Sequence, residues 1–154
     1  MKRPTPSTSS VGKPVVSLPC ACANLRRAAR IVTQLYDQEL RPTGLRVTQF
    51  TLLQALAHAR NISQGSLGEL LGLDSTTLTR TLALLRSKGW IQAKRGEDRR
   101  QIRLMLKASG RREYRRVLPY WLSAQKRLRK SMGKVRWNGV MEAAIRTAAL
   151  APEP

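Results

Sequence analysis

The chain has 154 residues, and its 29 lysines and arginines against nine acidic residues leave a formal net charge of +20 at pH 7. This length suits one domain with an extension, and the charge favours a polyanionic partner through counterion release. No apolar run approaches the ~20 residues of a membrane-spanning helix, and the N-terminus lacks the apolar core of an export signal. We therefore expect a cytoplasmic protein with no membrane partner.

The N-terminal part predicts an arm followed by two helices. Residues 1–18 are rich in proline, serine and threonine, a composition typical of a flexible basic arm. A first helix is predicted from Pro19 to about Leu40, with an apolar stripe of Leu25, Ala28, Ala29, Val32, Leu35 and Tyr36. A second helix is predicted with Thr48 as its N-cap and with core-facing Phe50, Leu53, Leu56 and Ala57.

The chain has two cysteines, Cys20 and Cys22, which should be reduced in a protein without an export signal. A helix that opens at Pro19 would hold both in its first turn, where the positive end of the helix dipole stabilises a thiolate. A reactive thiol and a small apolar filler at a subunit seam are both open interpretations. Together with the lone His58 the cysteines supply at most three ligands, so no metal site is predicted.

From Ser63 onward the pattern predicts a helix-turn-helix motif. A first short helix carries Leu67, Leu70 and Leu71, and a second carries Leu78, Leu82 and Leu85. Gly72 breaks the periodicity between them, and Asp74 suits the N-cap of the second helix. The exposed side of that helix would offer short hydroxylated and basic groups to a major groove: Ser75, Thr76, Thr77, Thr79 and Arg80. A solvated polar helix face is the alternative interpretation.

A basic hairpin is predicted next, because residues 90–95 and 101–106 alternate apolar and polar side chains. Its tip and flanks hold Arg95, Arg99 and Arg100, with Arg103 on the return strand. A narrow minor groove concentrates negative potential and attracts inserted arginines, so the hairpin would act as a DNA-contacting wing. The alternative is a solubilising tip.

From about Cys20 to the C-terminus, the chain resembles the MarR family of winged-helix transcriptional regulators. The likeness is carried by Leu45–Leu53, by the helix pair and by Gly96–Arg100 followed by Leu106–Gly110. The family's wing motif Asp-x-Arg is matched by Asp98 and Arg100, and the resemblance implies that the aspartate fixes the tip while the arginine reaches DNA. Lys107 stands where the family commonly has threonine.

The resemblance also implies two kinds of effector. Cys22 matches the oxidation-sensing cysteine of the organic-hydroperoxide-responsive branch, and Tyr36 matches a tyrosine that contacts that cysteine from the partner subunit. Arg26 stands where this branch has a further tyrosine. Family members also bind small aromatic acids in a cleft between the dimer interface and the DNA-binding part, which would be bordered here by Arg46, Trp121 and Tyr36.

Two helices are predicted after the hairpin. The first is long, is kinked at Pro119 and carries Tyr114, Val117, Leu118, Trp121, Gln125 and Leu128 on one face. The last runs from about Val135 to Leu150. These two helices and the first helix together carry more apolar surface than the core of a winged helix can bury. We assign the remaining apolar surface to a homodimer interface.

The predicted fold class is mainly α with a small β-hairpin wing, a winged helix-turn-helix with a helical dimerisation region. We divide it into a flexible arm (1–18), an N-terminal dimerisation helix and linker (19–47), a DNA-binding region (48–107) and C-terminal dimerisation helices (108–154). Carboxylates are scattered and no glycine-rich phosphate loop occurs, so neither catalysis nor a cofactor is predicted.

The predicted function is that of a homodimeric repressor of transcription. Two-fold symmetry predicts a pseudopalindromic operator in double-stranded DNA, with half-sites roughly 34 Å apart. Binding of a small ligand or oxidation of a cysteine would release the protein from its operator. The alternative is a structural protein that binds nucleic acid through its charge, largely without regard to sequence.

Overall fold

The computed structural model describes residues 19–95 and 101–150, and the chain divides into two units within its first helix, α1 (Ala21–Leu40). The second unit begins at Thr33 and contains every later element. The predicted start of α1 at Pro19 was wrong, because the first helical hydrogen bond runs from the Asn24 N–H to the Cys20 carbonyl. The helix ends at Leu40, as predicted, and a 3₁₀ turn follows (Arg41–Thr43).

The N-cap of helix α2 (Val47–Ala59) is Arg46, and a residue of the preceding helix binds the first N–H of α2. Thr48 was predicted as its N-cap, but Thr48 lies inside the first turn. Asp37 of α1 supplies the acceptor instead, because its Oδ1 accepts a hydrogen bond from the Val47 N–H at 2.7 Å. Its Oδ2 pairs with Nη1 of Arg46 at 3.1 Å. The end of α1 and the start of α2 are therefore joined by one carboxylate.

The helix-turn-helix motif is confirmed and consists of α3 (Gln64–Leu71) and α4 (Ser75–Ser87). Gly72 ends α3 in the left-handed region, with φ of 59°. Leu67 is buried as predicted, whereas Leu70 is 63% exposed. A helix of two turns contacts the core along one narrow stripe, and Leu70 lies outside that stripe.

Three antiparallel strands form a small sheet in the order β1-β3-β2. The hairpin of β2 (Ile91–Arg95) and β3 (Ile102–Leu106) was predicted, and its register pairs Ile91 with Leu106 and Arg95 with Ile102. The short strand β1 (Ile62–Ser63) was not predicted. The base of the hairpin is buried, but Ile102 at its far end is 40% exposed. The hairpin therefore leaves the core as it approaches its tip.

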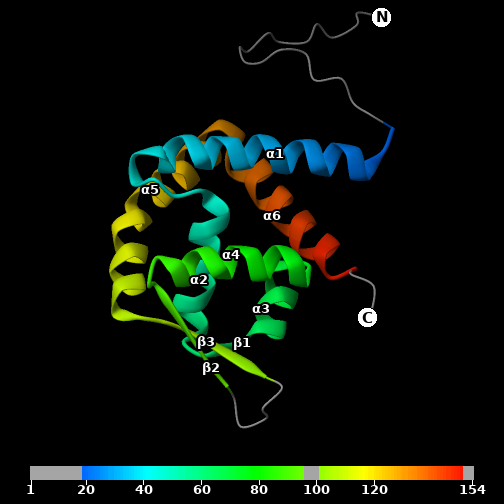
Figure 1. The fold of residues 1–154 in the computed structure, drawn as a ribbon. Helices are drawn as coiled ribbons and strands as arrows, with labels where there is room; N and C mark the ends of the chain where they lie inside the picture. The colour runs from blue at the N-terminus through cyan, green and yellow to red at the C-terminus, as the bar shows by residue number, and fades with distance from the viewer. Residues whose placement is uncertain (1–18, 96–100, 151–154) are drawn as a thin grey trace, which may run out of the picture. The chain divides into compact units, whose positions relative to one another are not determined.

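The long helix α5 (Ala108–Met132) packs on α2 and is one continuous helix through Pro119 (Figure 1). Phe50 joins the two helices, since its ring centroid lies 5.5 Å from that of Tyr114 and 5.9 Å from that of Trp121. Gly133 then turns the chain into α6 (Lys134–Ala148), which lies beside α5. All described residues of α6 are exposed or half-buried.

Polar contacts tie α5 to the end of α1 and to the turn before α2. Arg127 pairs with Glu39 at 2.8 Å between Nη1 and Oε1. Arg116 binds Glu113 through two nitrogens and donates to the Thr43 carbonyl at 2.8 Å, and its bonds to Glu113 raise the pKa of the guanidinium. No helix in the described ranges is long and apolar enough to cross a membrane.

Candidate nucleic-acid interface

Helix α4 begins with a side-chain cap. Its N-cap, Asp74, accepts hydrogen bonds from the Thr77 backbone N–H at 2.8 Å and from the Thr77 hydroxyl at 2.7 Å. Both bonds stabilise the ionised carboxylate and hold the pKa of Asp74 below its ordinary value. The predicted cap is confirmed, and it commits the hydroxyl proton of Thr77 to Asp74.

The two faces of α4 differ in chemistry as the sequence predicts. The buried face consists of Leu78, Leu82 and Leu85, each at most 2% exposed. The exposed residues include Ser75, Thr76, Thr79 and Arg80. Short hydroxylated side chains let a helix approach a duplex closely, and hydroxyls and a guanidinium donate hydrogen bonds to base edges and phosphates.

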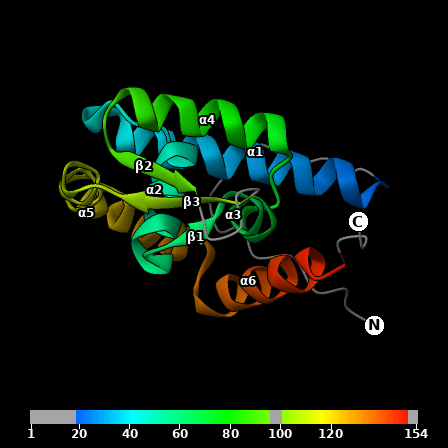
Figure 2. The ribbon, with the colours of Figure 1, turned by 60° about the horizontal axis from the view of Figure 1, so that its bottom comes forward.

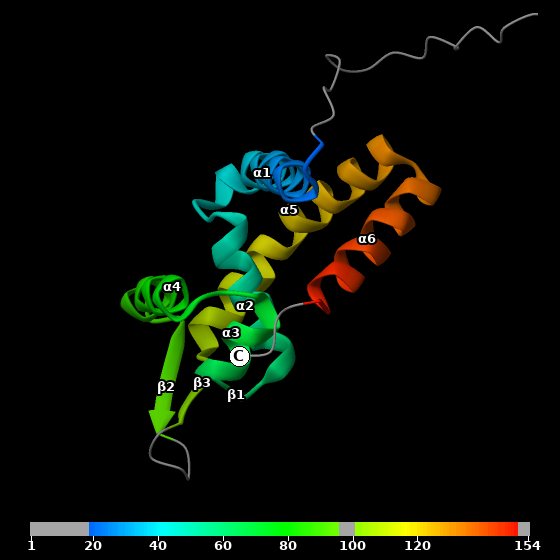
Figure 3. The same ribbon diagram turned by 90° about the vertical axis from the view of Figure 1, so that its right-hand side faces the viewer.

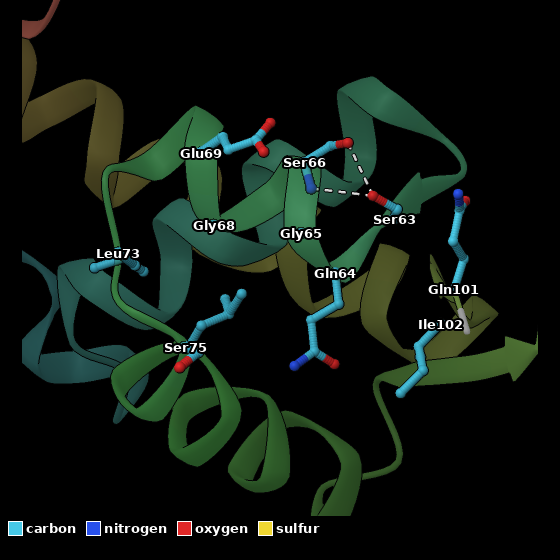
Figure 4. A pocket seen from close by; sticks show the side chains of 11 residues that line it. Ser63, Gln64, Gly65, Ser66, Gly68, Glu69, Leu73, Ser75, Gln101 and Ile102 are labelled. Atoms are coloured by element: carbon cyan, nitrogen blue, oxygen red, sulfur yellow. Dashed lines mark hydrogen bonds between the residues drawn. The ribbon is translucent and has the colours of Figure 1, made fainter. Parts of the chain in front are cut away.

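Gln64 of α3 contacts the exposed side of α4. Its Nε2 donates a hydrogen bond to Thr79 Oγ1 at 3.2 Å, and Figure 4 shows its side chain pointing toward α4. Because Gln64 takes one acceptor position of Thr79, the Thr79 hydroxyl proton stays available to another acceptor. The sequence analysis missed Gln64, since no local pattern indicates a contact between residues 15 positions apart.

A hollow of about 560 Å³ lies between α3, the first turn of α4 and the start of β3 (Figure 4). Ser63, the N-cap of α3, accepts a hydrogen bond from the Ser66 N–H at 3.0 Å and donates its hydroxyl to Ser66 Oγ at 2.8 Å. Ser75 and Gln101 line the opposite sides and are exposed. The hollow therefore leaves the first turn of α4 open to solvent.

The β2–β3 hairpin lies next to α4. Figures 2 and 3 agree that both are on the side of the second unit away from α6. Arg95 is exposed at the far end of β2, and Arg103, which is paired with Lys94, is half-buried. The predicted tip residues Asp98, Arg99 and Arg100 lie outside the described residues. We call the elements from α2 to β3 the reading head.

The residues predicted for redox sensing lie near the two ends of α1. Cys20 immediately precedes the helix, Cys22 is in its first turn, and both thiols are exposed. Tyr36 lies near the other end, where it is 8% exposed and donates its hydroxyl to Gln125 Oε1 at 2.7 Å. Burial raises the pKa of this phenol.

The three residues predicted to border one ligand cleft occupy different surroundings. Arg46 lines a cavity of about 450 Å³ next to Asp37, which holds its guanidinium. Trp121 packs on Phe50 and lines another cavity, of about 700 Å³, between α5 and α6. Tyr36 is buried against Gln125. Among the residues that the structure describes, no group of three or more histidines, cysteines and acids is placed to hold a metal ion.

The fold and the exposed polar face of α4 beside a hairpin define a winged-helix protein of the DNA-binding type. The model of the MarR family matches residues 45–102. The M. tuberculosis transcriptional regulator MosR, in its crystal structure in complex with DNA, is 35% identical in sequence to this chain. The two structures match with a TM-score of 0.77, and the match covers 86% of this chain and 96% of that one. The chain belongs to the MarR family, whose members are transcriptional regulators that bind DNA.

Curated relatives agree with this assignment. The regulator SarZ of Staphylococcus haemolyticus is 34% identical over 90 residues, which are 58% of this chain and 61% of SarZ. YwoH of Bacillus subtilis, an HTH-type transcriptional regulator, is 27% identical over 93 residues, which are 60% of this chain and 68% of YwoH. The similarity to these relatives therefore covers only part of each chain.

Proposed function

We propose that this chain is a homodimeric repressor that reads a pseudopalindromic operator with α4 and the hairpin. The observation that carries the proposal is the exposed row of hydroxyls and Arg80 on a helix anchored by three buried leucines. The DNA complex of MosR supports it, because that regulator is 35% identical over nearly its whole length. Base and phosphate contacts on α4 are assigned to Ser75, Thr76, Thr77, Thr79 and Arg80.

The wing supplies the second set of contacts. Arg95, Arg99 and Arg100 would reach phosphates or a minor groove, and Asp98 would fix the tip. Support comes from the exposure of Arg95 and from the way the hairpin leaves the core beside α4. Arg100→Ala should then weaken binding to the operator. Unchanged affinity of this variant would reject the wing assignment.

Dimerisation is assigned to residues 19–47 and 108–154. Helix α6 supports this assignment, because it carries exposed apolar side chains such as Val135 (85%) and Ile145 (66%). A stable helix of this composition requires a covering surface. A two-fold partner would supply that surface and would place two reading heads on one duplex, so the operator should be pseudopalindromic.

Release from DNA is assigned to a small ligand or to oxidation of Cys22, with Cys20 as the neighbouring thiol. A hydroperoxide would oxidise the Cys22 thiolate to a sulfenic acid and leave as the alcohol. The exposed position of Cys22 in the first turn of α1 supports access by the oxidant. Tyr36 would have to leave Gln125 before its hydroxyl met a partner's cysteine.

Selection of bound DNA from a random library, at physiological salt and against excess bulk DNA, tests the reading function. We expect a palindromic site. Arg80→Ala should lose roughly tenfold or more in affinity for that site, the effect of one bidentate base contact, with little change on bulk DNA. Arg136→Ala removes an equal charge from α6, outside the reading head, and is the matched control. Once size-exclusion chromatography shows that this variant still pairs as the wild type does, it should leave site preference unchanged.

The alternative function is charge-driven binding without sequence preference, favoured by the net charge of +20. In that case no site would be enriched, and Arg80→Ala and Arg136→Ala would weaken binding equally.

For the oxidation step, operator release by peroxide should occur in the wild type and fail in Cys22→Ser. Equal behaviour of the two proteins would reject thiol sensing and leave ligand control.

A further inference from the structure

The threonines of α4 differ in where their hydroxyl protons go. Thr77 donates its proton to Asp74 Oδ2 at 2.7 Å, and Thr81 donates its proton to the Thr77 carbonyl oxygen at 2.9 Å. Thr79, which is exposed, accepts a hydrogen bond, but its own proton has no acceptor within the described part of the chain. The Thr79 proton is therefore left for a partner outside the chain.

Gln64, the first residue of α3, sets this state of the Thr79 hydroxyl. Its side chain points toward α4 beside the hollow between α3, α4 and β3 (Figure 4), and its Nε2 donates to Thr79 Oγ1 at 3.2 Å. A hydroxyl has one proton and two lone pairs, so this bond occupies a lone pair and leaves the proton free. The amide nitrogen is a donor and cannot take that proton. Gln64 therefore presents Thr79 to a duplex as a donor.

The free proton matters once α4 lies in a major groove, because water then leaves the contact. A donor without an acceptor loses its hydrogen bonds to water, whereas the Thr79 oxygen keeps the bond from Gln64. In the major groove guanine and thymine offer acceptor oxygens, adenine offers an acceptor nitrogen and a donor amino group, and cytosine offers only a donor amino group. Cytosine would therefore leave the Thr79 proton unpaired and place a second donor against it.

We propose that Gln64 is a positioning residue that makes Thr79 select guanine or thymine, and reject cytosine, at one position of each operator half-site. The proposal rests on the proposed function, in which α4 reads base edges, and adds to it the class of base that one side chain selects. Gln64 lies on α3, outside the residues assigned to DNA contact. Because its role is to hold the Thr79 hydroxyl as a donor, the test follows the direction of a base preference rather than the strength of binding.

The first step of the test finds the base pair that Thr79 contacts. Sites are selected from a random library with the wild type and with Thr79→Val, which replaces the hydroxyl by a methyl group. We expect the wild type to enrich guanine or thymine at one position of each half-site, and Thr79→Val to lose that preference. Competition among four duplexes that differ only at this pair should show the wild type binding the cytosine duplex roughly tenfold more weakly.

Two substitutions of Gln64 then change what Thr79 offers to the base. Gln64→Met keeps an unbranched side chain but cannot donate, so the preference should fall toward equal affinities. Gln64→Glu brings a carboxylate that accepts the Thr79 proton, so Thr79 should act as an acceptor and favour cytosine or adenine. The matched control is Gln101→Glu, which adds the same negative charge at another wall of the hollow and should keep the wild-type preference.

A reversed preference in Gln64→Glu would support the proposal, because a purely structural role of Gln64 would lower the affinity for all four duplexes alike. A wild-type preference retained in both Gln64 variants would overturn it and leave the proposed function intact. A Thr79→Val selection identical to that of the wild type would do the same. A wild-type chain that enriches no site would instead reject the proposed function, and this inference with it.

Discussion

The reading head and α6 use similar apolar residues with opposite results. Phe50, Leu67 and Leu104 of the head are fully buried, whereas Val135 and Ile145 of α6 are 85% and 66% exposed. The core of the head is completed within one chain, because α5 packs on α2 and covers the side that the three helices and the sheet of the head leave open. Helix α6 contacts α5 along one side and meets no second layer in the described chain. Apolar periodicity thus predicts that a face will be covered, but not which chain covers it.

The largest effect is expected when one apolar side chain is replaced in each region. Phe50→Ala should lower the free energy of unfolding by roughly 3–5 kcal/mol, because the cavity it leaves lies between Tyr114 and Trp121. Ile145→Ala should cost far less in dilute protein and should instead weaken pairing of the chains. Urea unfolding at several protein concentrations measures both effects.

Equal losses of unfolding free energy for the two variants in dilute protein would contradict this contrast. They would mean that Ile145 is covered within its own chain. A loss at Ile145 that grows with protein concentration would sharpen the comparison, since it would place the missing cover on a second copy.

Two helical glycines extend the comparison to backbone packing. A Cβ on Gly110 of α5 would clash with the Trp90 carbonyl oxygen, whereas nothing lies within 4 Å of a Cβ on Gly139 of α6. Gly110→Ala should therefore destabilise the chain by about 3 kcal/mol, because backbone must move. Gly139→Ala should stabilise α6 by about 0.5–1 kcal/mol. Chemical denaturation measures both, and a tolerated Gly110→Ala would refute the close packing of the head.

The reading head was the part most open to prediction. The leucines of α4, the Asp74 cap and the alternation of the hairpin are local signals, and each appears in the structure. The cap of α2 escaped prediction, because Asp37 reaches Val47 from another helix. Strand β1 has two residues, too few for an alternating pattern, and it depends on pairing with β3.

In the candidate interface, too, local features could be predicted from the sequence, whereas contacts between elements could not. The exposed face of α4 follows from helical spacing, whereas the Gln64 contact with Thr79 depends on how α3 crosses α4. The cavity between α5 and α6 was not anticipated either. Trp121 and Trp137 are separated by the turn at Gly133, and their approach requires the folded hairpin of helices.

The smallest effect concerns how α4 and α6 begin. Asp74 caps α4, whereas α6 starts at Gly133 with no side-chain cap. The pKa of Asp74 is lowered in the folded chain, so its charge contributes stability above the unfolded pKa. This contribution is lost as pH falls through the folded pKa. Asp74→Asn keeps an acceptor for the Thr77 N–H but has no charge to lose.

The melting temperature of the wild type should therefore exceed that of Asp74→Asn at about pH 6, and the gap should narrow toward about pH 2. Circular dichroism of both proteins across this range measures the gap. A gap independent of pH would mean that the carboxylate charge does not stabilise α4, and that Asp74 acts only as a hydrogen-bond acceptor.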